Sequence, residues 1–339
     1  MRKPSAFDLF CGAGGLTLGL KQAGFAVRGA LDFEPTALRT YRMNHAGVRV
    51  WEADIRRVVA RQVLKSLGLK KGGLDLLAGC PPCQAFSSLR TLNGRKRVRD
   101  RDKDLLFEFL RFARVLSPKA ILLENVPGLA HDPRLDRFRA SLRRLGYSVA
   151  FRVVDAAQYG VPQRRRRLLL LASRVGSVSF AKPASMRRTV RTALHGIGAP
   201  GFTRDPLHNV KETRSQKVAS FISRIPKDGG SRADLGADAQ LDCHTRCDGF
   251  SDVYGRMSWD KVSPTITSGC VNPSKGRFLH PSEDRCITLR EAALLQTFPK
   301  SYRFSLDRGK FDVARMIGNA LPPELVRRQA LVIHRDTLR

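Results

Sequence analysis

Acidic residues are scarce in this chain, and several other features are missing. Asp and Glu number 30 against 61 Lys and Arg, which gives a formal net charge of +31. No stretch reaches the ~18 apolar residues of a membrane span, and no long apolar segment of a signal peptide follows Met1. The seven cysteines are odd in number and unevenly spaced, which disfavours a disulfide framework. We expect a cytoplasmic protein with reduced thiols and no membrane contact.

The rest of the composition is that of a globular protein with a basic surface. The 339 residues, 42% of them hydrophobic, suffice for one large or two moderate domains. Of the basic residues, 45 are Arg and 16 are Lys, and they are spread along the whole chain. Arginine makes bidentate contacts with phosphate and guanine, so the charge favours a nucleic-acid partner. An arginine-rich composition without functional meaning is the alternative.

Strands and helices alternate through roughly the first 175 residues, which predicts a doubly wound α/β sheet with helices on both faces. The expected strands are 6–10, 26–31, 74–79, 120–123, 148–155 and 167–172. The expected helices are 14–23, 35–43, 56–67, 103–116 and 135–145. From about 175 to 285, Gly, Ser, Asp, Arg and Pro dominate, which is typical of a smaller, loop-rich domain. Helical patterns return at 289–296, 311–317 and 323–335.

The most informative segment is 79–87, Gly-Cys-Pro-Pro-Cys-Gln-Ala-Phe-Ser. It follows the apolar run 74–78, so Cys83 should emerge at the carboxyl end of a buried strand, the edge at which open α/β sheets bind ligands. A cysteine needed only for packing does not require a rigid Pro-Pro before it. A turn that happens to hold a buried cysteine is the alternative.

A glycine-rich turn follows the first expected strand. Residues 7–15 read Phe-Asp-Leu-Phe-Cys-Gly-Ala-Gly-Gly and lead into a helix, whose first N–H groups are free to bind a ligand. Asp32 ends the second strand, where a carboxylate can bind a ribose diol, and Phe33 beside it could stack on a base. Asp54 ends the next short apolar segment and could accept from an adenine amino group. Each residue alone is more often a turn or a cap, but the ordered set predicts an adenosine pocket.

Glu124 ends the strand 120–123, one strand position along from Cys83, so a carboxyl and a thiol should share one sheet edge. A cysteine hydrolase would need a histidine base, and no His ends an expected strand. A carboxyl beside a thiol suits attack on a pyrimidine ring, because the thiolate adds to C6 while the acid hydrogen-bonds N3. A glutamate that caps the next helix is the alternative.

Two basic segments accompany these groups. Residues 163–167, Gln-Arg-Arg-Arg-Arg, lead into a strand, which would point Arg165 and Arg167 to one face and their neighbours to the other. A solvated basic edge strand is the alternative for that segment. Residues 90–103 carry seven Lys and Arg, and we interpret them as a mobile loop that could close over a phosphate backbone.

Taken in order, these motifs resemble the bacterial and phage type of the DNA (cytosine-5)-methyltransferase family. The resemblance rests on seven segments. Four of them have short motifs: a Phe-x-Gly-x-Gly-like turn at 10–14, Pro-Cys-Gln at 82–84, Glu-Asn-Val at 124–126 and Gln-x-Arg-x-Arg at 163–167. The other three are the longer segments 256–267, 289–299 and 317–323. It covers the chain except roughly 175–250. It implies a Rossmann-like, S-adenosylmethionine-dependent methyltransferase sheet with helices on both faces, plus a smaller, loop-rich target-recognition domain. The implied bounds are 1–185 and 311–339 for the catalytic and cofactor-binding domain, and 186–310 for target recognition.

The resemblance also implies a role for individual residues. Cys83 is the expected nucleophile, and Glu124 is expected to contact N3 and the 4-amino group of a flipped-out cytosine. Arg165 is expected to bind the O2 side of that base, with Arg167 supporting the site. The residues expected around S-adenosylmethionine are Phe10, Gly12, Gly14, Leu16, Asp32, Phe33, Asp54, Ile55, Pro81 and Asn319. The residues expected at DNA are Gln84, Ser87, Arg97, Arg187, Arg188, Arg246 and Lys275, with Arg191 a further candidate.

The implied reaction moves a methyl group from S-adenosylmethionine to C5 of a cytosine in a short, specific sequence of double-stranded DNA, through a covalent Cys83–C6 adduct. We expect a monomer in the bacterial cytoplasm, with no metal and no obligatory protein partner, and a cognate restriction endonuclease that acts separately. Two alternatives stay open: a tRNA cytosine-5 methyltransferase, and a catalytically silent DNA-binding homologue. A cytidine deaminase is disfavoured, because no His-x-Glu precedes a Pro-Cys-x-x-Cys signature.

Overall fold

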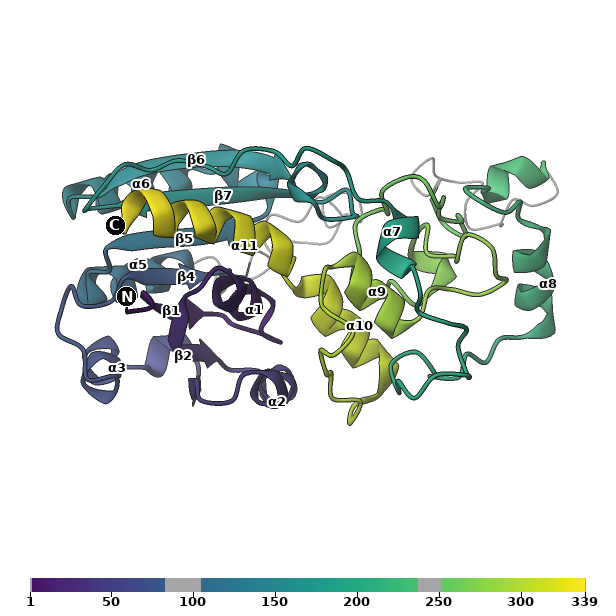
Figure 1. Cartoon of the computed structure of the whole chain (residues 1–339), viewed down its shortest axis with the longest axis horizontal. Coiled ribbons are helices and arrows are strands. Elements are labelled where there is room, and N and C mark those ends of the chain that lie inside the picture. The colour runs from purple at the N-terminus through teal and green to yellow at the C-terminus, as the bar shows by residue number, and fades with distance from the viewer. Residues whose placement is uncertain (1, 83–104, 237–251, 339) are drawn as a thin grey trace. The chain divides into compact units, whose positions relative to one another are not determined.

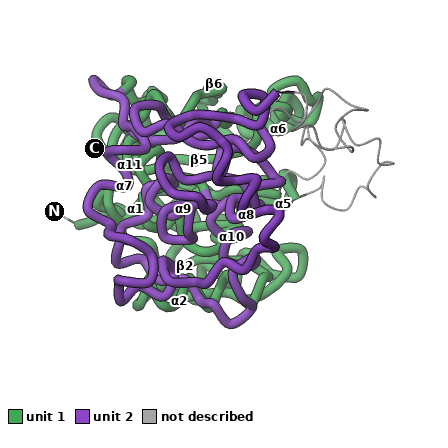
Figure 2. Tube along the Cα trace, turned by 90° about the vertical axis from the view of Figure 1, so that its right-hand side faces the viewer, with its two compact units in different colours: residues 1–159, 166–183, 321–339 green, residues 160–165, 184–320 purple. Residues whose placement is uncertain are grey.

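The computed structural model describes residues 2–82, 105–236 and 252–338. The chain divides into two compact units, which Figure 2 colours separately. Unit 1 comprises residues 1–159, 166–183 and 321–339, and unit 2 comprises residues 160–165 and 184–320. The C-terminal segment thus returns to unit 1 from residue 321, ten residues later than the bound that we expected, and residues 160–165 belong to unit 2.

Unit 1 is built on one sheet of seven strands in the order β3–β2–β1–β4–β5–β7–β6 (Figure 1). The strands are β1 Ser5–Leu9, β2 Ala26–Asp32, β3 Arg49–Glu52, β4 Leu76–Gly79, β5 Ala120–Asn125, β6 Ser148–Asp155 and β7 Arg166–Ser173. Strands β1 to β5 pair in parallel, and β7 runs antiparallel between β5 and β6. The central strands are buried along their length, as their apolar runs predicted. The carboxyl ends of β1, β2, β4 and β5 therefore lie at one edge of the sheet, which we call the carboxyl edge.

Helices cover both faces of this sheet (Figure 1). One face carries α1 Gly15–Gln22, α2 Pro35–Asn44 and α11 Pro323–Val332, and the other carries α3 Ala60–Ser66, α5 Leu105–Leu116 and α6 Pro133–Arg144. The apolar positions that predicted α5 are all buried in the core: Leu105, Leu106, Phe109, Leu110, Phe112, Ala113 and Leu116. The fold is thus the Rossmann-like α/β sheet that the sequence predicts.

Two local predictions were incomplete. The edge strand β3 was not predicted, because Arg49-Val-Trp-Glu is short and only half-buried, and its pairing with β2 defines it. The helix expected over 56–67 is wrong in its first part: a 3₁₀ turn spans Ile55–Arg57, and α3 begins only at Ala60. Between them, the β-branched Val58 and Val59 adopt extended backbone angles, which interrupts the helix.

Helix α11 packs tightly against α1 at a glycine. A Cβ atom on Gly19 would lie 2.5 Å from the carbonyl oxygen of Pro323 and 2.5 Å from the Cβ of Val326. Glycine is therefore required for the close approach of the two helices. Helix α11 thus packs onto unit 1 although it lies far from α1 in the sequence.

Substitution of Gly19 by alanine is expected to destabilise unit 1. Overpacking against a backbone oxygen costs about 1–3 kcal/mol or more, which exceeds the gain in helix propensity of about 1 kcal/mol. Urea unfolding of Gly19→Ala should therefore show a lower midpoint. Gln22→Ala changes an exposed residue of the same helix and should leave the midpoint unchanged. A Gly19→Ala variant as stable as wild type would contradict the close contact.

Unit 2 consists, in its described residues, of helices, 3₁₀ turns and irregular segments joined by isolated bridges. Its helices are α7 Val190–Leu194, α8 Gln216–Arg224, α9 Leu289–Leu295 and α10 Gly309–Asn319. The fully buried Arg256 organises the loops, because its guanidinium donates to the carbonyl oxygens of His280 (2.7 Å) and Ile222 (3.1 Å) and to Asp284 (2.9 Å). Across the described part of the chain, no helix is long and apolar enough to cross a membrane.

Candidate active site

Polar groups follow the strands of unit 1 at the carboxyl edge. The turn 10–14 follows β1, Asp32 ends β2, residues 80–82 follow β4, and Glu124 and Asn125 end β5. Because β1, β4 and β5 are neighbours in register, Leu9 pairs with Gly79 and Gly79 with Leu123. The structure therefore brings the predicted cofactor turn and the predicted catalytic carboxyl to the same edge of one sheet.

The glycine turn is held by Asp32. One carboxylate oxygen of Asp32 accepts from the N–H of Gly12 at 2.8 Å, and the other accepts from the N–H groups of Phe33 (2.8 Å) and Glu34 (3.0 Å). Gly12 has φ +50°, and a Cβ atom built there would meet nothing within 4 Å, so a ligand can approach the backbone closely. Burial raises the pKa of Asp32. This open, rigid turn fits a nucleoside-type cofactor.

Phe33 and His45 flank this turn in different ways. The ring of Phe33 is 62% exposed directly after Asp32, as a stacking platform requires. The Nε2 of the buried His45 donates to the carbonyl oxygen of Gly14 at 3.2 Å. Burial lowers the pKa of His45 to about 4, which keeps the ring neutral at physiological pH. Sequence reasoning missed His45, since a lone histidine at a helix end carries no specific pattern.

The other residues expected near the cofactor have visible packing or capping roles. Leu16 and Ile55 are buried, and so is Pro81. Phe10 is half-buried with φ +61°. Asp54 caps the 3₁₀ turn: its carboxylate accepts from the N–H of Arg56 at 3.0 Å and from the Arg56 guanidinium at 2.9 Å. That hydrogen bond lowers the pKa of Asp54.

The catalytic carboxyl expected at the end of β5 is held by an arginine. The Nε of Arg167 lies 2.8 Å from Oε1 of Glu124, and both side chains are largely buried. Next to it, Asn125 donates from Nδ2 to the carbonyl oxygen of Pro81 at 3.2 Å. Asn125 thereby ties the end of β5 to the segment that leads into Cys83. Cys83 itself, with Gln84, Ser87 and Arg97, lies outside the described residues.

Cys80 differs from a nucleophilic cysteine. Burial, and then the nearby charge of Glu124, raise the pKa of its thiol well above the usual range. A neutral thiol is a poor nucleophile, because the thiolate is the reactive form. Of the two cysteines in the Cys-x-x-Cys segment, the raised pKa thus disfavours Cys80 as the nucleophile.

Asp8 is a buried carboxyl at this edge that sequence reasoning missed. It is fully buried in β1, and the hydroxyl of Thr17 donates to its Oδ2 at 2.7 Å. Thr17 in turn lies 2.9 Å from the hydroxyl of Tyr41. Burial raises the pKa of Asp8 to about 7. The available signal was a carboxyl within the otherwise apolar run 6–10.

The titration of Asp8 should make stability depend on pH. The unfolded chain loses this proton near pH 4, whereas the folded protein keeps it until about pH 7. The free energy of unfolding therefore falls as pH rises through this window. Asp8→Asn removes that fall, so its stability relative to wild type should rise by up to about 4 kcal/mol between pH 4 and pH 8.

Chemical unfolding at pH 4, 6 and 8 checks this expectation. Asp136→Asn, which changes an exposed carboxylate, is the matched control and should show no such rise. A stability difference between Asp8→Asn and wild type that does not change with pH would contradict the buried, protonated state of Asp8.

The arginine segment alternates in burial as predicted. Arg164 and Arg166 are exposed, Arg165 is buried and Arg167 is largely buried. However, Arg165 belongs to unit 2, where its guanidinium donates to the carbonyl oxygens of Ile266 (3.0 Å) and Gly318 (2.9 Å). Asn319, expected near the cofactor, also belongs to unit 2, where it ends α10 with an exposed side chain. The roles expected for Arg165 and Asn319 stay predictions.

Buried amides connect the motif segments within unit 2. The side chain of Gln163 donates to Oε1 of Gln296 at 2.9 Å and accepts from the N–H of Ile266 at 2.9 Å. Gln296 donates to the carbonyl oxygen of Ile317 at 2.6 Å. These contacts join the motif segment 163–167 to the three motif segments 256–267, 289–299 and 317–323. Their role in the structure is to fix the loops around Arg165.

The basic residues expected at DNA are only partly described. Arg187, Arg188 and Lys275 are exposed in unit 2, which suits contact with a phosphate backbone. Arg191 is exposed but makes a bidentate pair with Asp260 at 2.7 and 2.8 Å. Arg246 lies outside the described residues.

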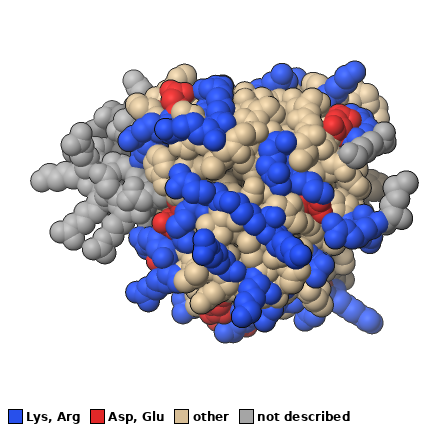
Figure 3. Space-filling model, turned by 90° about the vertical axis from the view of Figure 1, so that its left-hand side faces the viewer, with Lys and Arg blue, Asp and Glu red and all other residues tan. Residues whose placement is uncertain are grey.

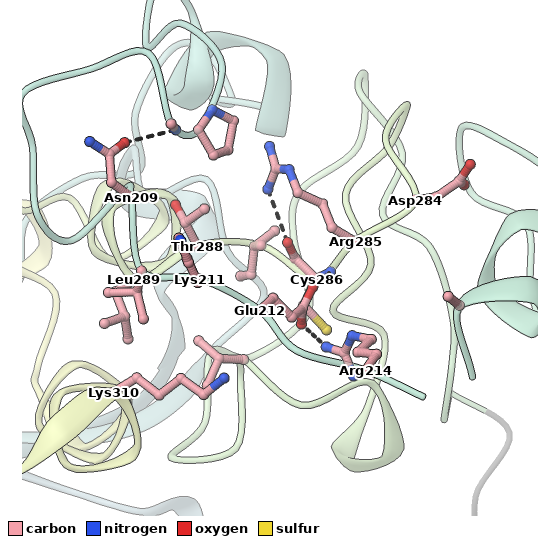
Figure 4. Close-up of a pocket in the computed structure, with 16 residues that line it drawn as sticks. Asn209, Lys211, Glu212, Arg214, Asp284, Arg285, Cys286, Thr288, Leu289 and Lys310 are labelled. Carbon is pink, nitrogen blue, oxygen red and sulfur yellow. Dashed lines mark hydrogen bonds and ion pairs between the residues drawn. The ribbon is translucent and has the colours of Figure 1, made fainter. Parts of the chain in front are cut away.

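Unit 2 also contains a cavity of about 470 Å³ (Figure 4). In it, Arg214 pairs with Glu212, and the Arg285 guanidinium donates to the carbonyl oxygen of Cys286 at 2.9 Å. Burial raises the pKa of Cys286 to about 11, so its thiol is neutral. None of the expected catalytic or cofactor residues lines this cavity, and we assign it no part in the reaction.

Comparison with known proteins decides the family. The sequence profile of the family described as C-5 cytosine-specific DNA methylase matches residues 5–335. The chain belongs to this family. It is 38% identical to the Type II methylase M.HgiDII of Herpetosiphon aurantiacus, over 95% of this chain and 93% of that protein. It is 33% identical to the Type II methyltransferase M.Eco47II of Escherichia coli, over 95% of this chain and 76% of that protein.

Solved structures share the fold. An E. coli prophage protein assigned as a DNA modification methyltransferase superposes with a TM-score of 0.73 at 23% identity, over 99% of this chain and 100% of the other. DNMT2 of Spodoptera frugiperda superposes with a TM-score of 0.63 at 16% identity, over 96% of this chain and 98% of the other. At these identities the likeness shows the fold alone. The expected family, the methyltransferase sheet and the enzyme class, a DNA (cytosine-5)-methyltransferase, are thus confirmed.

Proposed function

We propose that this chain transfers a methyl group from S-adenosylmethionine to C5 of a cytosine in one short sequence of double-stranded DNA. The observation that carries the proposal is the arrangement of side chains at the carboxyl edge of unit 1. There, Glu124 is fixed by Arg167 at 2.8 Å, and Asn125 ties the same strand end to the segment that leads into Cys83. The carboxyl of Glu124 at this edge and the open glycine turn beside it are groups that this reaction needs, and the thiol that it also needs is the one that we assign to Cys83.

The residues around the glycine turn fit S-adenosylmethionine. Asp32 holds the turn and can accept from a ribose diol, Phe33 offers an exposed ring to the adenine, and the space above Gly12 is open. When bound, the cofactor supplies an electrophilic methyl group. Methylation yields S-adenosylhomocysteine as the second product. Asp54 has the least structural support as a cofactor contact, because its carboxylate already accepts a hydrogen bond from the Arg56 guanidinium.

Nucleophilic attack on the base is the task of Cys83. A free thiol has a pKa of about 8.5, so the site must stabilise the thiolate. The thiolate forms a bond to cytosine C6, and the ring electrons move toward C5, which becomes nucleophilic enough to take a methyl group. A base then removes the C5 proton, the C5–C6 double bond re-forms and the thiolate of Cys83 leaves.

Glu124 acts on the opposite side of the ring. It hydrogen-bonds N3 and the 4-amino group, so that the charge displaced by attack at C6 is stabilised. Arg167 is a positioning residue for this carboxyl, since it contacts Glu124 and fixes its orientation. The cytosine must leave the base stack to reach these groups, which costs a few kcal/mol.

The experiment that tests this function measures transfer of labelled methyl from S-adenosylmethionine to mixed-sequence duplex DNA and, separately, to tRNA. We expect incorporation into duplex DNA only. Transfer to tRNA alone would favour the RNA-modifying alternative. DNA binding without any transfer would favour the catalytically silent homologue.

Binding to duplex DNA should depend strongly on salt. With a formal net charge of +31, the chain is expected to displace counterions from phosphates, which lowers log K by about 0.9 per contact for each tenfold rise in salt. Titration of a fluorescent duplex at 50 to 200 mM salt should show an affinity loss of at least about tenfold. An affinity that does not change with salt would contradict the interpretation that the basic surface binds the phosphates of DNA.

The finer assignments follow from this function. We propose that unit 2 carries target recognition, because Arg187 and Arg188, on an irregular segment, and Lys275, at the end of a 3₁₀ turn, are exposed and can contact a DNA groove. We also propose that the chain acts as a monomer in the bacterial cytoplasm, as the modification enzyme beside a separate restriction endonuclease. The Type II names of its relatives support the modification-enzyme part of this proposal.

A further inference from the structure

Basic side chains gather at the edge of the unit 1 sheet that lies opposite the carboxyl edge. Strands β1, β4, β5 and β6 begin there, β7 ends there, and helices α3, α5 and α6 end there. We call this surface the amino edge and define it by Arg2, Lys3, Lys65, Lys70, Lys71, Arg114, Lys119, Arg143, Arg144 and Arg174. All of these side chains are exposed except that of Lys119, which is half-buried.

The loops that carry these residues form one contiguous surface. The guanidinium of Arg174 donates to the carbonyl oxygens of Pro118 at 3.1 Å and Gly72 at 3.4 Å, which joins three loops. The Nζ of Lys119 lies 2.7 Å from Asp75, which also lies 3.5 Å from Arg2. These contacts hold Arg2, Lys119 and Arg174 in place and join the loops from which the neighbouring basic side chains project.

Acidic residues do not balance this array. Among the described residues, the carboxylates that we find at the amino edge are Asp75, which is buried and paired with Lys119, and Asp336, which pairs with Arg335. Figure 3 faces the amino edge and shows Lys and Arg over much of it, with few Asp and Glu. The surface thus carries a large uncompensated positive charge.

Helix stabilisation accounts for only part of this charge. Lys65, Arg114, Arg143 and Arg144 stand in the last turns of their helices, where a cation interacts favourably with the free carbonyl groups. Lys70 and Lys71 stand in the loop before β4, outside any helix, and Lys3 precedes β1. Their exposed charges have no such structural reason.

The composition of the surface favours a phosphate backbone over a protein partner. Protein interfaces use aromatic anchors in their buried centre. The exposed aromatic side chains of the described residues are Phe33 at the carboxyl edge and Phe202 and Phe311 in unit 2. The amino edge therefore offers dispersed cations without an aromatic anchor, which is the pattern of sequence-independent contact with nucleic acid.

We propose that the amino edge binds the backbone of a second duplex DNA segment, without sequence preference, while a first duplex occupies the carboxyl edge. The two edges are separated by the full length of the strands, so one straight duplex on the first does not reach the second. Simultaneous contact would let the enzyme pass directly from one DNA segment to another. The inference rests on the proposed function, since it takes duplex DNA as the substrate.

Two matched triple variants test this proposal. The first, Lys70→Gln with Lys71→Gln and Arg144→Gln, removes three charges from the amino edge. The control, Arg28→Gln with Arg152→Gln and Lys182→Gln, removes three exposed charges of unit 1 outside the two edges. Each protein is loaded on an immobilised duplex, and capture of a second, fluorescent duplex of unrelated sequence is measured. Methyl transfer to a short single duplex is measured in parallel.

Wild type and control are expected to capture the second duplex. The amino-edge variant should capture it at least about tenfold more weakly, with a salt slope lower by about 2.7 for three lost contacts. Its methyl transfer to the single duplex should stay within about twofold of wild type.

Equal capture by the amino-edge variant and the control would overturn the proposal, and so would wild type that methylates DNA without capturing a second duplex. Capture of tRNA in place of duplex DNA would overturn it in favour of an RNA partner. A wild type that neither binds nor methylates the first duplex would instead refute the proposed function, and this inference with it.

Discussion

Replacement of Cys83 by serine should abolish methyl transfer, with a rate at least about 10³-fold below wild type. The hydroxyl of serine ionises far less readily than a thiol, so it does not attack C6 without an adjacent base. No histidine follows an expected strand in this chain to act as that base. Labelled methyl incorporation into mixed-sequence duplex DNA measures the loss, and binding of the same duplex should stay within about threefold of wild type.

Cys80→Ser is the matched control for this variant. Cys80 stands three residues earlier, and burial and the charge of Glu124 raise the pKa of its thiol well above the usual range. Its side chain lies beside Glu124, so its rate is expected to fall somewhat but to stay well above that of Cys83→Ser. A duplex that contains 5-fluorocytosine gives a second readout, because fluorine takes the place of the C5 proton and cannot be removed by a base, so the Cys–C6 bond stays intact. Wild type and Cys80→Ser should form this covalent complex, whereas formation of it by Cys83→Ser would contradict the role of Cys83.

Replacement of Glu124 by glutamine should lower the rate of methyl transfer by about 10²–10³, which is the typical loss when one charge-stabilising contact is removed from a transition state. An amide keeps the shape of the side chain but does not carry the proton or charge that N3 requires. The variant also leaves the largely buried Arg167 without its partner, which lies at 2.8 Å in wild type. Single-turnover kinetics at saturating cofactor and DNA isolate this step from binding.

Glu52→Gln provides the comparison for Glu124→Gln. Glu52 also ends a strand of the same sheet and also pairs with an arginine, Arg42, at 2.9 Å, but it is exposed. It should have activity close to that of wild type. Thermal unfolding of both variants separates a fold defect from a chemical one. A properly folded Glu124→Gln that retains wild-type single-turnover rates would remove Glu124 from the mechanism.

The sequence predicted the sheet because its central strands are buried on both faces and so appear as apolar runs. The runs 120–123 and 167–172 correspond to β5 and β7, and the residues that follow such strands, Asp32 and Glu124, lie where expected. The edge strand β3 could not be predicted in the same way. Its four residues form a strand because they pair with β2, and their own sequence does not show this pairing.

The contacts that hold the expected site residues within each unit join segments far apart in sequence. Asn125 reaches Pro81, 44 residues away, and Arg165 reaches Gly318, 153 residues away. A local pattern shows that an amide or a guanidinium is present but not which carbonyl it binds. For the same reason the sequence did not reveal that Arg165 and Arg167, only two residues apart, belong to different units.

The most direct measurement of the central claim is bisulfite sequencing of plasmid DNA from cells that express the wild-type chain or Cys83→Ser. The account predicts cytosines protected from conversion in one recurring short context with wild type, and none with Cys83→Ser. Complete conversion with wild type, or the same protection with both proteins, would contradict a sequence-specific DNA cytosine-5 methyltransferase that acts through Cys83.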